Sequence, residues 1–513
     1  MAIAEDEPIT ILPDEPRPAG GPRAESLSES VAVLLALMIV QRLIGFVRSV
    51  LFCRWLSPEQ LGQWDMAYGF LMFAAPLAVL GLPGSFGRYV EHYRQREQLR
   101  SFLRRACITS LGLGTAAMTC LVLVPSWFAS LIFGSDAPPG MMPIITVGLA
   151  ATIVFNLLTS LFIALRRSRV VSLMQFVSSL VFASLGTFLL WRAADPRGAI
   201  AAFTVSYLVA IAWAMFWMRS MWRSLPQCGD PLSYRSMWTR LMPFAFGLWV
   251  TNWLLNMFEI ADRFLLVHTS GLDSATALDL VGQYHSARLV PVLMVSIAEL
   301  LAAVMMPHLS GDWEMGRPEH VSRRLGFVLK LFGLAATVGA AVFLIAAPVL
   351  FRVAFHAKFG AGEMILPWTL MYCVWTSLAS IGFNYLWCAE RSRLVTGTLA
   401  LGLALNVALN VVLLPVWGLW GAVISTTIAK GMVLVLIALA SRWHGMRIDR
   451  GLVLVAALPL LLAVNPWAAL AAATLVALAR GPRLRCWTPR ELAHVQSQWQ
   501  NYRARAMALL ARC

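Results

Sequence analysis

Nine ionisable side chains lie within stretches of this sequence that are otherwise apolar, where a charge needs a physical reason. They are Arg42, Arg48, Asp65, Glu259, Asp262, Arg263, Arg288, Glu299 and Lys430. At the centre of a bilayer such a side chain costs about 2.5–3.5 kcal/mol on insertion scales, so it usually faces a partner or a polar cavity. Guanidinium groups offer a permanently charged fork to phosphate oxygens, whereas membrane-embedded carboxylates are candidates for ion or proton coupling.

A purely structural role is an open alternative for some of these residues. Asp65, Asp262 and Arg263 could pair with neighbouring helices or reach toward an interface instead of meeting a ligand. Arg42 lies nearer to the middle of its apolar stretch, so the sequence favours a cavity-facing position for it.

The sequence lacks the motifs of common catalytic and nucleotide-binding sites. It contains no GxxxxGK[ST], HExxH or GxSxG motif, and its GxxGxxG run at Gly81, Gly84 and Gly87 ends an apolar stretch with no preceding strand. The eight cysteines include no CxxC pair, so neither a disulfide framework nor a metal site is expected. We therefore expect no enzyme and no cofactor, and we do not expect ATP to drive the protein directly.

Long apolar blocks must hold the charged residues. Of the 513 residues, 59% are hydrophobic and only 13% are charged, against roughly 25% charged in an ordinary soluble domain. A membrane helix needs about 20 mostly apolar residues, and the blocks lack the two-residue alternation of barrel strands. The sequence predicts an all-α integral membrane protein of about fourteen helices. The expected spans are 30–52, 62–82, 106–133, 142–164, 170–191, 198–218, 242–267, 282–306, 326–350, 364–388, 394–414, 418–441, 451–465 and 467–480.

The charged loops predict the orientation. The net charge is +15, and 21 Arg follow the even-numbered spans up to the twelfth, whereas the opposite loops hold five Arg or Lys. The positive-inside rule places the Arg-rich loops, and with them both termini, in the cytoplasm of a bacterial inner membrane. Because the charge lies in short loops, it indicates topology and contacts with membrane lipids, and no nucleic-acid partner is expected.

The two ends of the chain differ from its middle. Residues 1–29 predict a disordered cytoplasmic tail. Residues 451–480 predict an extra short helix pair that turns at Asn465-Pro466, with one span kinked at Pro466 as the alternative. Residues 481–513 predict a basic amphipathic cytoplasmic tail that lies on the inner leaflet or docks against the cytoplasmic loops.

The two halves of the chain resemble each other at a nearly fixed offset. LGQW at 61–64 matches VGQY at 281–284; Pro125 and Phe128 match Pro348 and Phe351; RSRV at 167–170 matches RSRL at 391–394; and GAI at 198–200 matches GAV at 421–423. Six spans separate the matched points, so both halves insert in the same sense. The pattern predicts six-helix lobes at 30–220 and 242–441, a cytoplasmic linker at 221–241, a V-shaped central cavity and alternating access.

Four motifs together resemble one family of membrane transporters. Residues 41–48, QRLIGFVR, resemble the first helix of lipid II flippases, and residues 284–289, YHSARL, followed by PHLS at 307–310, resemble their eighth helix. Residues 56–62, LSPEQLG, and 413–422, LLPVWGLWGA, are similar to motifs of the polysaccharide flippases. The chain is thereby identified, over about residues 30–480, as a member of the multidrug, oligosaccharidyl-lipid and polysaccharide flippase superfamily.

The resemblance implies a flippase for a polyprenyl-pyrophosphate-linked oligosaccharide, used in O-antigen or exopolysaccharide synthesis. It implies this lipid-linked oligosaccharide as the bound partner, and a polysaccharide polymerase as a further one. A lipid II flippase ranks second because that branch lacks the LSPE link. A cation-coupled multidrug extrusion pump ranks third because such pumps rely on acidic cavities and usually have twelve spans.

The implied mechanism gives each charged residue an expected role. A cationic cavity would bind the pyrophosphate head while the polyprenyl tail stays in lipid, so the expected substrate-binding residues are Arg42, Arg48, Arg288, Arg263 and Lys430. The expected coupling residues are Asp65, Glu259, Asp262 and Glu299.

Overall fold

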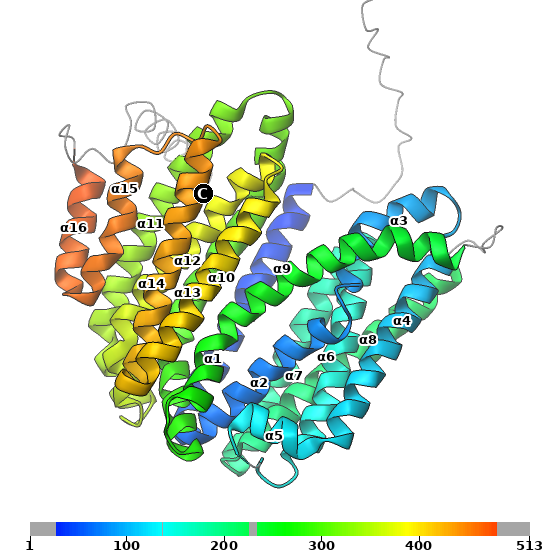
Figure 1. The fold of residues 1–513 in the computed structure, drawn as a ribbon, viewed down its shortest axis with the longest axis horizontal. Coiled ribbons are helices and arrows are strands. Elements are labelled where there is room, and N and C mark those ends of the chain that lie inside the picture. Colours follow the sequence, from blue (N-terminus) through cyan, green and yellow to red (C-terminus); the bar gives the residue numbers. More distant parts are fainter. Residues whose placement is uncertain (1–26, 136, 225–232, 480–513) are drawn as a thin grey trace, which may run out of the picture.

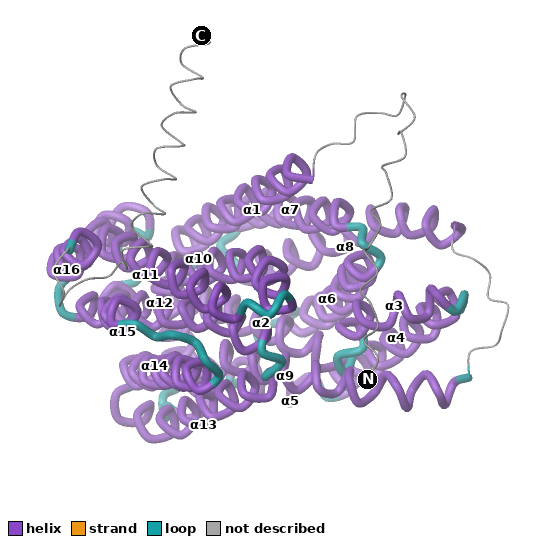
Figure 2. Tube along the Cα trace, turned by 90° about the horizontal axis from the view of Figure 1, so that it is seen from above, coloured by secondary structure: helices purple, strands orange, loops and turns teal. Residues whose placement is uncertain are grey.

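The structure is a computed structural model that describes residues 27–135, 137–224 and 233–479. Within those ranges the chain is built from helices and their connecting loops, as Figure 1 and the view from above in Figure 2 show. The predicted all-α integral membrane class is therefore confirmed. The tail predictions for 1–26 and 480–513 concern residues outside the described ranges, as does part of the predicted linker at 221–241.

The first half of the chain comprises eight α-helices. They are α1 (Leu27–Trp55), α2 (Pro58–Ala78), α3 (Phe86–Gln95), α4 (Leu99–Leu123), α5 (Pro125–Phe133), α6 (Met141–Ala164), α7 (Ser168–Arg192) and α8 (Pro196–Ser224), with a short 3₁₀ turn at Pro83–Ser85. The α2 start has a local cause in the sequence: the Ser57 hydroxyl accepts a hydrogen bond from the Gln60 amide, the Gln60 side chain caps the Ser57 amide, and Pro58 occupies the first turn.

The second half comprises the remaining helices. They are α9 (Tyr234–Thr269), α10 (Ser274–Glu314), α11 (Pro318–Val349), α12 (Gly360–Cys388), α13 (Ser392–Trp417), α14 (Leu419–Trp443), α15 (Arg450–Ala457) and α16 (Pro466–Leu478), with a π-turn at Leu350–Ala354 and a 3₁₀ segment at Leu458–Ala463.

All fourteen predicted spans coincide with helical segments, but two of them differ in shape from the prediction. The expected span 106–133 breaks at Val124, where Pro125 starts α5 as a separate helix. The chain also bends by 63° after α2, because Leu80 and Gly81 take φ values of 49° and 69° and leave the helix. By length and composition, ten described helices could cross a membrane, or eleven with this bent pair, besides two shorter apolar helical segments. The total of fourteen membrane spans stays a prediction.

The two halves share one apolar core at the end where the helices converge in Figure 1. That core contains residues of both halves, such as Phe52, Leu61, Leu278 and Phe355. Away from it, the first half and the second half have separate cores. The helix α9 connects these two separate cores. Its Met237 packs in the core of the first half, and its Phe258 packs in the core of the second half.

A close contact between α2 and α10 joins the halves within the shared core. A Cβ atom on Gly62 would overlap the carbonyl of Leu278, and one on Gly282 would overlap the carbonyl of Pro58. Leu278 lies 220 residues after Pro58, and Gly282 lies 220 residues after Gly62, so the contact is reciprocal. A two-fold relation between the matched segments requires such reciprocity; the superposition of complete six-helix lobes stays a prediction.

The predicted extra helix pair is present and packs on the second half. The helices α15 and α16 lie side by side in Figure 1, and both contact α11, which agrees with a turn at Asn465. Buried Lys330 on α11 pairs with Asp449, the residue that caps α15. The Trp375 indole donates a 2.9 Å hydrogen bond to the carbonyl of Ala456.

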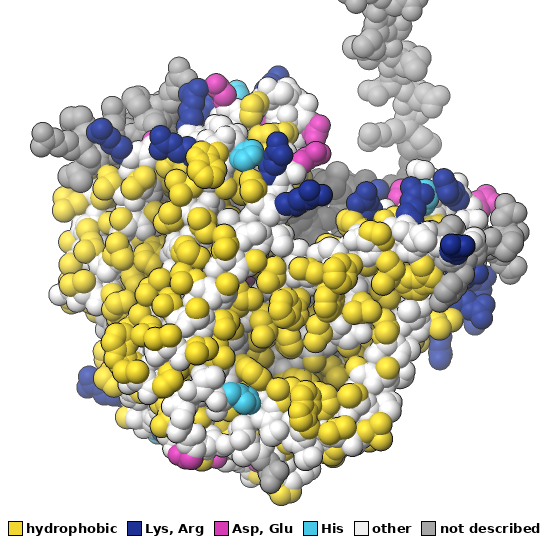
Figure 3. Space-filling model, viewed as in Figure 1, with side chains coloured by type: hydrophobic (Ala, Val, Ile, Leu, Met, Phe, Trp, Pro, Cys, Tyr) yellow, Lys and Arg dark blue, Asp and Glu magenta, His cyan; other side chains and the backbone are white. Residues whose placement is uncertain are grey.

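Hydrophobic side chains dominate the surface between the two ends of the molecule. Figure 3 shows them across the middle of the visible face, while most Lys and Arg on that face gather at the end opposite the convergence. A membrane protein of this kind exposes an apolar belt to lipid and keeps its basic loops at the interface.

Candidate functional site

A cavity of about 490 Å³ lies between the halves, beside the shared core. Side chains from six helices line it: α1, α2, α7 and α8 form the wall of the first half, and α9 and α10 form the wall of the second. Four of the five predicted substrate-binding residues line this cavity, namely Arg42, Arg48, Arg263 and Arg288, as do the predicted coupling residues Asp65 and Glu259.

The first wall carries two arginines that have no acidic partner among the described residues. The α1 register brings both Arg42 and Arg48 to the cavity. The Arg48 guanidinium lies 3.9 Å from the ring centroid of Phe182, a favourable cation–π arrangement, and its buried Nε has no hydrogen-bond partner in the described ranges. The Arg42 side chain is exposed. This wall therefore presents cationic donors that are free to meet a ligand.

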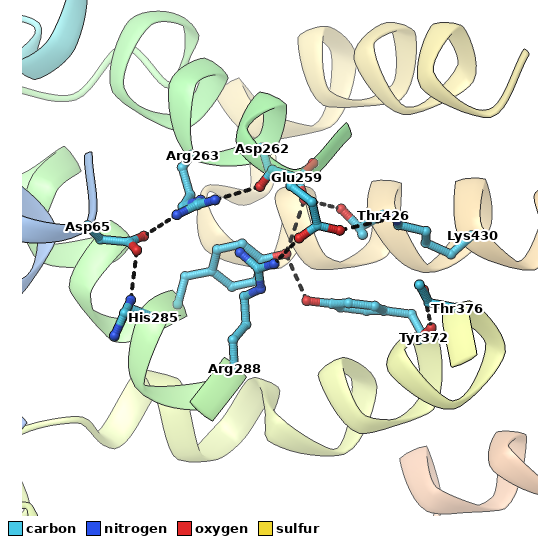
Figure 4. A network of polar contacts seen from close by, with 11 residues as sticks. Asp65, Glu259, Asp262, Arg263, His285, Arg288, Tyr372, Thr376, Thr426 and Lys430 are labelled. Carbon is cyan, nitrogen blue, oxygen red and sulfur yellow. Dashed lines mark hydrogen bonds and ion pairs between the residues drawn. The ribbon is translucent and has the colours of Figure 1, made fainter. Parts of the chain in front are cut away.

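A three-residue bridge connects the walls near the shared core (Figure 4). Asp65 on α2 accepts a 2.8 Å hydrogen bond from Arg263 on α9, and its other oxygen lies 2.7 Å from Nδ1 of His285 on α10. Asp65 is only 3% exposed, and Arg263 also donates to the carbonyl of Glu259. The charge of Arg263 is thus neutralised by a fixed partner, and Asp65 joins the two halves.

A second ion cluster lies on the wall of the second half. Glu259 accepts a 2.6 Å hydrogen bond from Arg288 through Oε2, and its Oε1 lies 3.5 Å from Nζ of Lys430 on α14. Lys430 does not line the cavity; it lies behind Glu259, 3.8 Å from the ring centroid of Phe258. Of the predicted substrate-binding residues, Lys430 is therefore the one that reaches the cavity only through another side chain.

Asp262, one helical turn after Glu259 on α9, points away from the cavity into the second half. Its carboxylate accepts hydrogen bonds from the Tyr284 hydroxyl at 3.1 Å, from the Asn406 and Asn410 amides at 2.9 Å each, and from the Thr426 hydroxyl at 2.5 Å. These donors come from α10, α13 and α14, so the buried carboxylate ties four helices together.

The same cluster contains oxygen atoms of the kind that bind small hard cations. Besides the Asp262 carboxylate, the Oδ1 atoms of Asn406 and Asn410 are buried and without a hydrogen-bond partner in the described part of the chain. Carboxylate, amide and hydroxyl oxygens are the ligands that such cations prefer. No group of three or more His, Cys, Asp or Glu that could hold a metal occurs among the described residues.

Glu299 is the predicted coupling residue that interacts with the charges of Glu259, Arg42 and Lys430 only at longer range. It lies on α10, eleven residues beyond Arg288, it is exposed, and it does not line the cavity. None of the described ion pairs or hydrogen bonds includes it.

Two groups of site residues have no signal in the sequence pattern. Aromatic rings of the first half line the cavity and pack on one another, among them Trp64, Tyr68, Phe203 and Tyr207. Tyr284 is the second case: its hydroxyl contacts Asp262 and lies 3.0 Å from the Tyr372 hydroxyl. Its ring centroid lies 5.3 Å from the Arg288 guanidinium. In an apolar sequence, aromatic residues of this kind look the same as ordinary core residues.

Comparisons with known proteins agree on the type of fold. The model of the family described as "Polysaccharide biosynthesis protein" matches residues 27–311, just over half of the chain. An uncharacterized membrane protein of Methanocaldococcus jannaschii is 27% identical over 187 residues, a match that spans 36% of this chain and 36% of that protein.

Three solved structures share the architecture. The lipid II flippase MurJ in an inward closed conformation has a TM-score of 0.68 and 13% identity, over 87% of this chain and 97% of that one. An inward-facing MATE family multidrug resistance transporter has a TM-score of 0.59 and 13% identity, over 79% and 94% of the two chains. A MOP superfamily transporter from Pyrococcus furiosus has a TM-score of 0.53 and 15% identity, over 82% of this chain and 94% of that one. At these identities the likeness shows the fold.

Proposed function

The chain belongs to the polysaccharide biosynthesis protein family, and from this membership we propose that it is a flippase for a polyprenyl-pyrophosphate-linked oligosaccharide. It would move this lipid from the cytoplasmic to the periplasmic leaflet of a bacterial inner membrane, for the synthesis of O-antigen or exopolysaccharide. A polysaccharide polymerase would then take over the delivered lipid.

The charge of the cavity is the observation that carries this proposal. Four arginines and two carboxylates line the cavity, so these six side chains carry an excess of two positive charges. A pyrophosphate diester carries one negative charge on each phosphate, so the head group matches the excess. Arg42 and Arg48 are the first donors it would meet, because described carboxylates already neutralise Arg263 and Arg288.

The mechanism follows from the cost of moving a charged head through a region of low dielectric constant. Guanidinium groups replace the water that the phosphates lose, while the apolar tail remains in the bilayer. The halves would then rock about their shared core, so that the cavity opens first to one side of the membrane and then to the other. The basic end of the molecule in Figure 3 would face the cytoplasm.

Asp262 is the coupling site that the structure supports best. Its position away from the cavity, in a cluster with the unpartnered amide oxygens of Asn406 and Asn410, suits a small cation, and its Tyr284 contact links it to the wall that carries Arg288. Asp65 acts instead as a fixed bridge between the halves in this proposal.

Two other functions fit the same fold. A lipid II flippase also moves a pyrophosphate-linked glycan, and the likeness to MurJ favours it as the second candidate. A multidrug extrusion pump is disfavoured by the cavity, because an excess of positive charge repels the cationic compounds that such pumps export.

The test is transfer of the lipid across vesicles that contain the purified protein. Wild type should move a polyprenyl-pyrophosphate oligosaccharide, and Arg42→Ala or Arg48→Ala should lower the rate by about tenfold or more, since each removes a charged donor. Arg42→Lys should restore part of the rate, because it keeps the charge without the fork. Normal transfer by folded Ala variants would refute the cationic-cavity mechanism. Preference for lipid II would select the second candidate, and export of a cationic drug would select the third.

A further inference from the structure

Glu259 stands out among the charged residues of the cavity because it is the exposed member of its cluster. Its side chain is 53% exposed, whereas those of its partners Arg288 and Lys430 are 15% and 12% exposed. Glu259 and Arg288 both line the cavity and Lys430 does not. Figure 4 shows the Glu259 carboxylate between the two cations. A ligand that enters the cavity therefore meets the Glu259–Arg288 pair, of which Glu259 is the more exposed member, before it reaches Lys430.

A carboxylate and a phosphate present the same kind of acceptor to a guanidinium. Both accept charge-assisted hydrogen bonds through oxygens that carry negative charge. An Arg side chain does not lose its proton in a protein, so Arg288 needs a counter-charge whenever the cavity holds no anion. Glu259 supplies that counter-charge in the empty cavity.

On these observations we infer that Glu259 is an internal counter-anion, which an entering phosphate displaces from Arg288. The displaced carboxylate stays paired with Lys430 while the cargo is bound, and it returns to Arg288 when the cargo leaves. Glu259 is thus a positioning residue that weakens binding and aids release. This inference rests on the proposed function.

The surroundings of Arg288 fix it in place while Glu259 exchanges. The Arg288 guanidinium lies over the ring of Tyr284, and the Tyr284 hydroxyl contacts both Asp262 and Tyr372. Glu259 has no comparable anchor among the described residues besides its two cations. Displacement therefore moves the Glu259 carboxylate and leaves the Arg288 guanidinium in place to bind the phosphate of the cargo.

The other carboxylate of the cavity does not have this freedom. Asp65 is buried, and its two oxygens are held by Arg263 from α9 and His285 from α10. An entering anion would have to separate the halves to displace it. Exchange is therefore specific to the Glu259–Arg288 pair.

The experiment measures two quantities for the full chain in lipid nanodiscs and vesicles: the Kd for undecaprenyl pyrophosphate and the rate of glycolipid transfer. Glu259→Gln should bind the probe about tenfold more tightly, because Arg288 loses its competing charge, and should transfer more slowly because release is impaired. Lys430→Met should act in the opposite direction and bind more weakly, because Glu259 then has only Arg288 to pair with. Glu314→Gln is the matched control, since it removes an exposed acid at the end of α10 that does not line the cavity, and it should leave the Kd unchanged.

The outcomes separate this inference from the proposed function. If wild type binds the probe and Arg42→Ala weakens that binding, but folded Glu259→Gln binds no more tightly, the counter-anion role is wrong and the flippase remains. If Glu259→Gln leaves the Kd unchanged and abolishes only the dependence of transfer on an ion gradient, Glu259 is a coupling residue instead. If wild type binds no pyrophosphate lipid, the proposed function itself fails. If Glu259→Gln does not fold, the Kd of Lys430→Met for undecaprenyl pyrophosphate tests the counter-anion role. Binding by this variant that is as tight as that of wild type, or tighter, contradicts the inference.

Discussion

At the scale of single residues, the membrane charges of this protein divide by whether they have partners. Arg42 and Arg48 face the cavity without a described acidic partner, whereas Asp262 is surrounded by four donors from three neighbouring helices. The sequence shows that each of these charges is unusual, but it does not show which of them have partners. Pairing depends on contacts between residues up to 220 positions apart.

Thr426 offers a direct test of how much the Asp262 cluster stabilises the fold. Its hydroxyl donates to the Asp262 carboxylate, whereas the hydroxyl of its neighbour Thr427 bonds only to the Val423 carbonyl of its own helix. Thr426→Val should lower the free energy of unfolding by about 1–3 kcal/mol, because a buried charged acceptor loses a donor. Thr427→Val is the matched control and should cost less. Thermal unfolding in detergent measures both, and equal losses would mean that the cluster contributes nothing of its own.

At the scale of elements, the helices follow from apolar length, and their interruptions follow from local chemistry. All fourteen predicted stretches are helical, but the break at Val124 and the bend after α2 were not predicted. The Pro125 signal is visible in the sequence, yet Pro76, Pro291 and Pro307 lie inside continuous helices. Proline alone therefore does not reveal which helix breaks, because the neighbouring helices decide it.

The contact between α2 and α10 tests the packing of these elements. Gly62→Ala should destabilise the protein by about 1–3 kcal/mol, because the added methyl group overlaps the backbone of α10 and forces the helices apart. Gly112→Ala in α4 is the control: no atom lies within 4 Å of its added Cβ, so it should be neutral or slightly stabilising. The amount of folded protein and its unfolding temperature report the result, and equal stability of the two variants would contradict the close packing.

At the scale of the whole molecule, the sequence predicts the membrane class and the relation between the halves better than it predicts the site. Matched segments at one offset anticipate the reciprocal contact of Gly62 and Gly282. The cavity walls could be predicted only as a set of charges, since the aromatic rings and Tyr284 have no distinctive spacing. The matched segments of the two halves keep the same order along the chain, so the sequence reveals them. The cavity is lined by residues from positions spread over both halves, so spacing along the chain does not reveal it.

The orientation of the whole molecule is testable with reporters that are active only outside the cytoplasm. Fusions at residues 137 and 272 should give signal, and fusions at 98, 230 and 500 should not, because the Arg-rich loops stay inside. Reporter activity at residue 98 without activity at residue 137 would show that the protein has the opposite orientation in the membrane, and it would reverse the proposed direction of transport. Activity at 500 alone would show that the last helix pair does not return the chain to the cytoplasm.

The bridge between Asp65 and Arg263 has a consequence for how the protein is made. The partners are 198 residues apart, and at a synthesis rate of about 5–20 residues per second Asp65 waits roughly 10–40 s for its guanidinium. During that interval the nascent first half holds an unpaired acid at membrane depth, which is costly. Asp65→Asn should therefore raise the lifetime of a nascent chain that stops before α9, while it destabilises the finished protein. Pulse labelling of both lengths would show whether the acid is a burden during biogenesis that only the completed chain relieves.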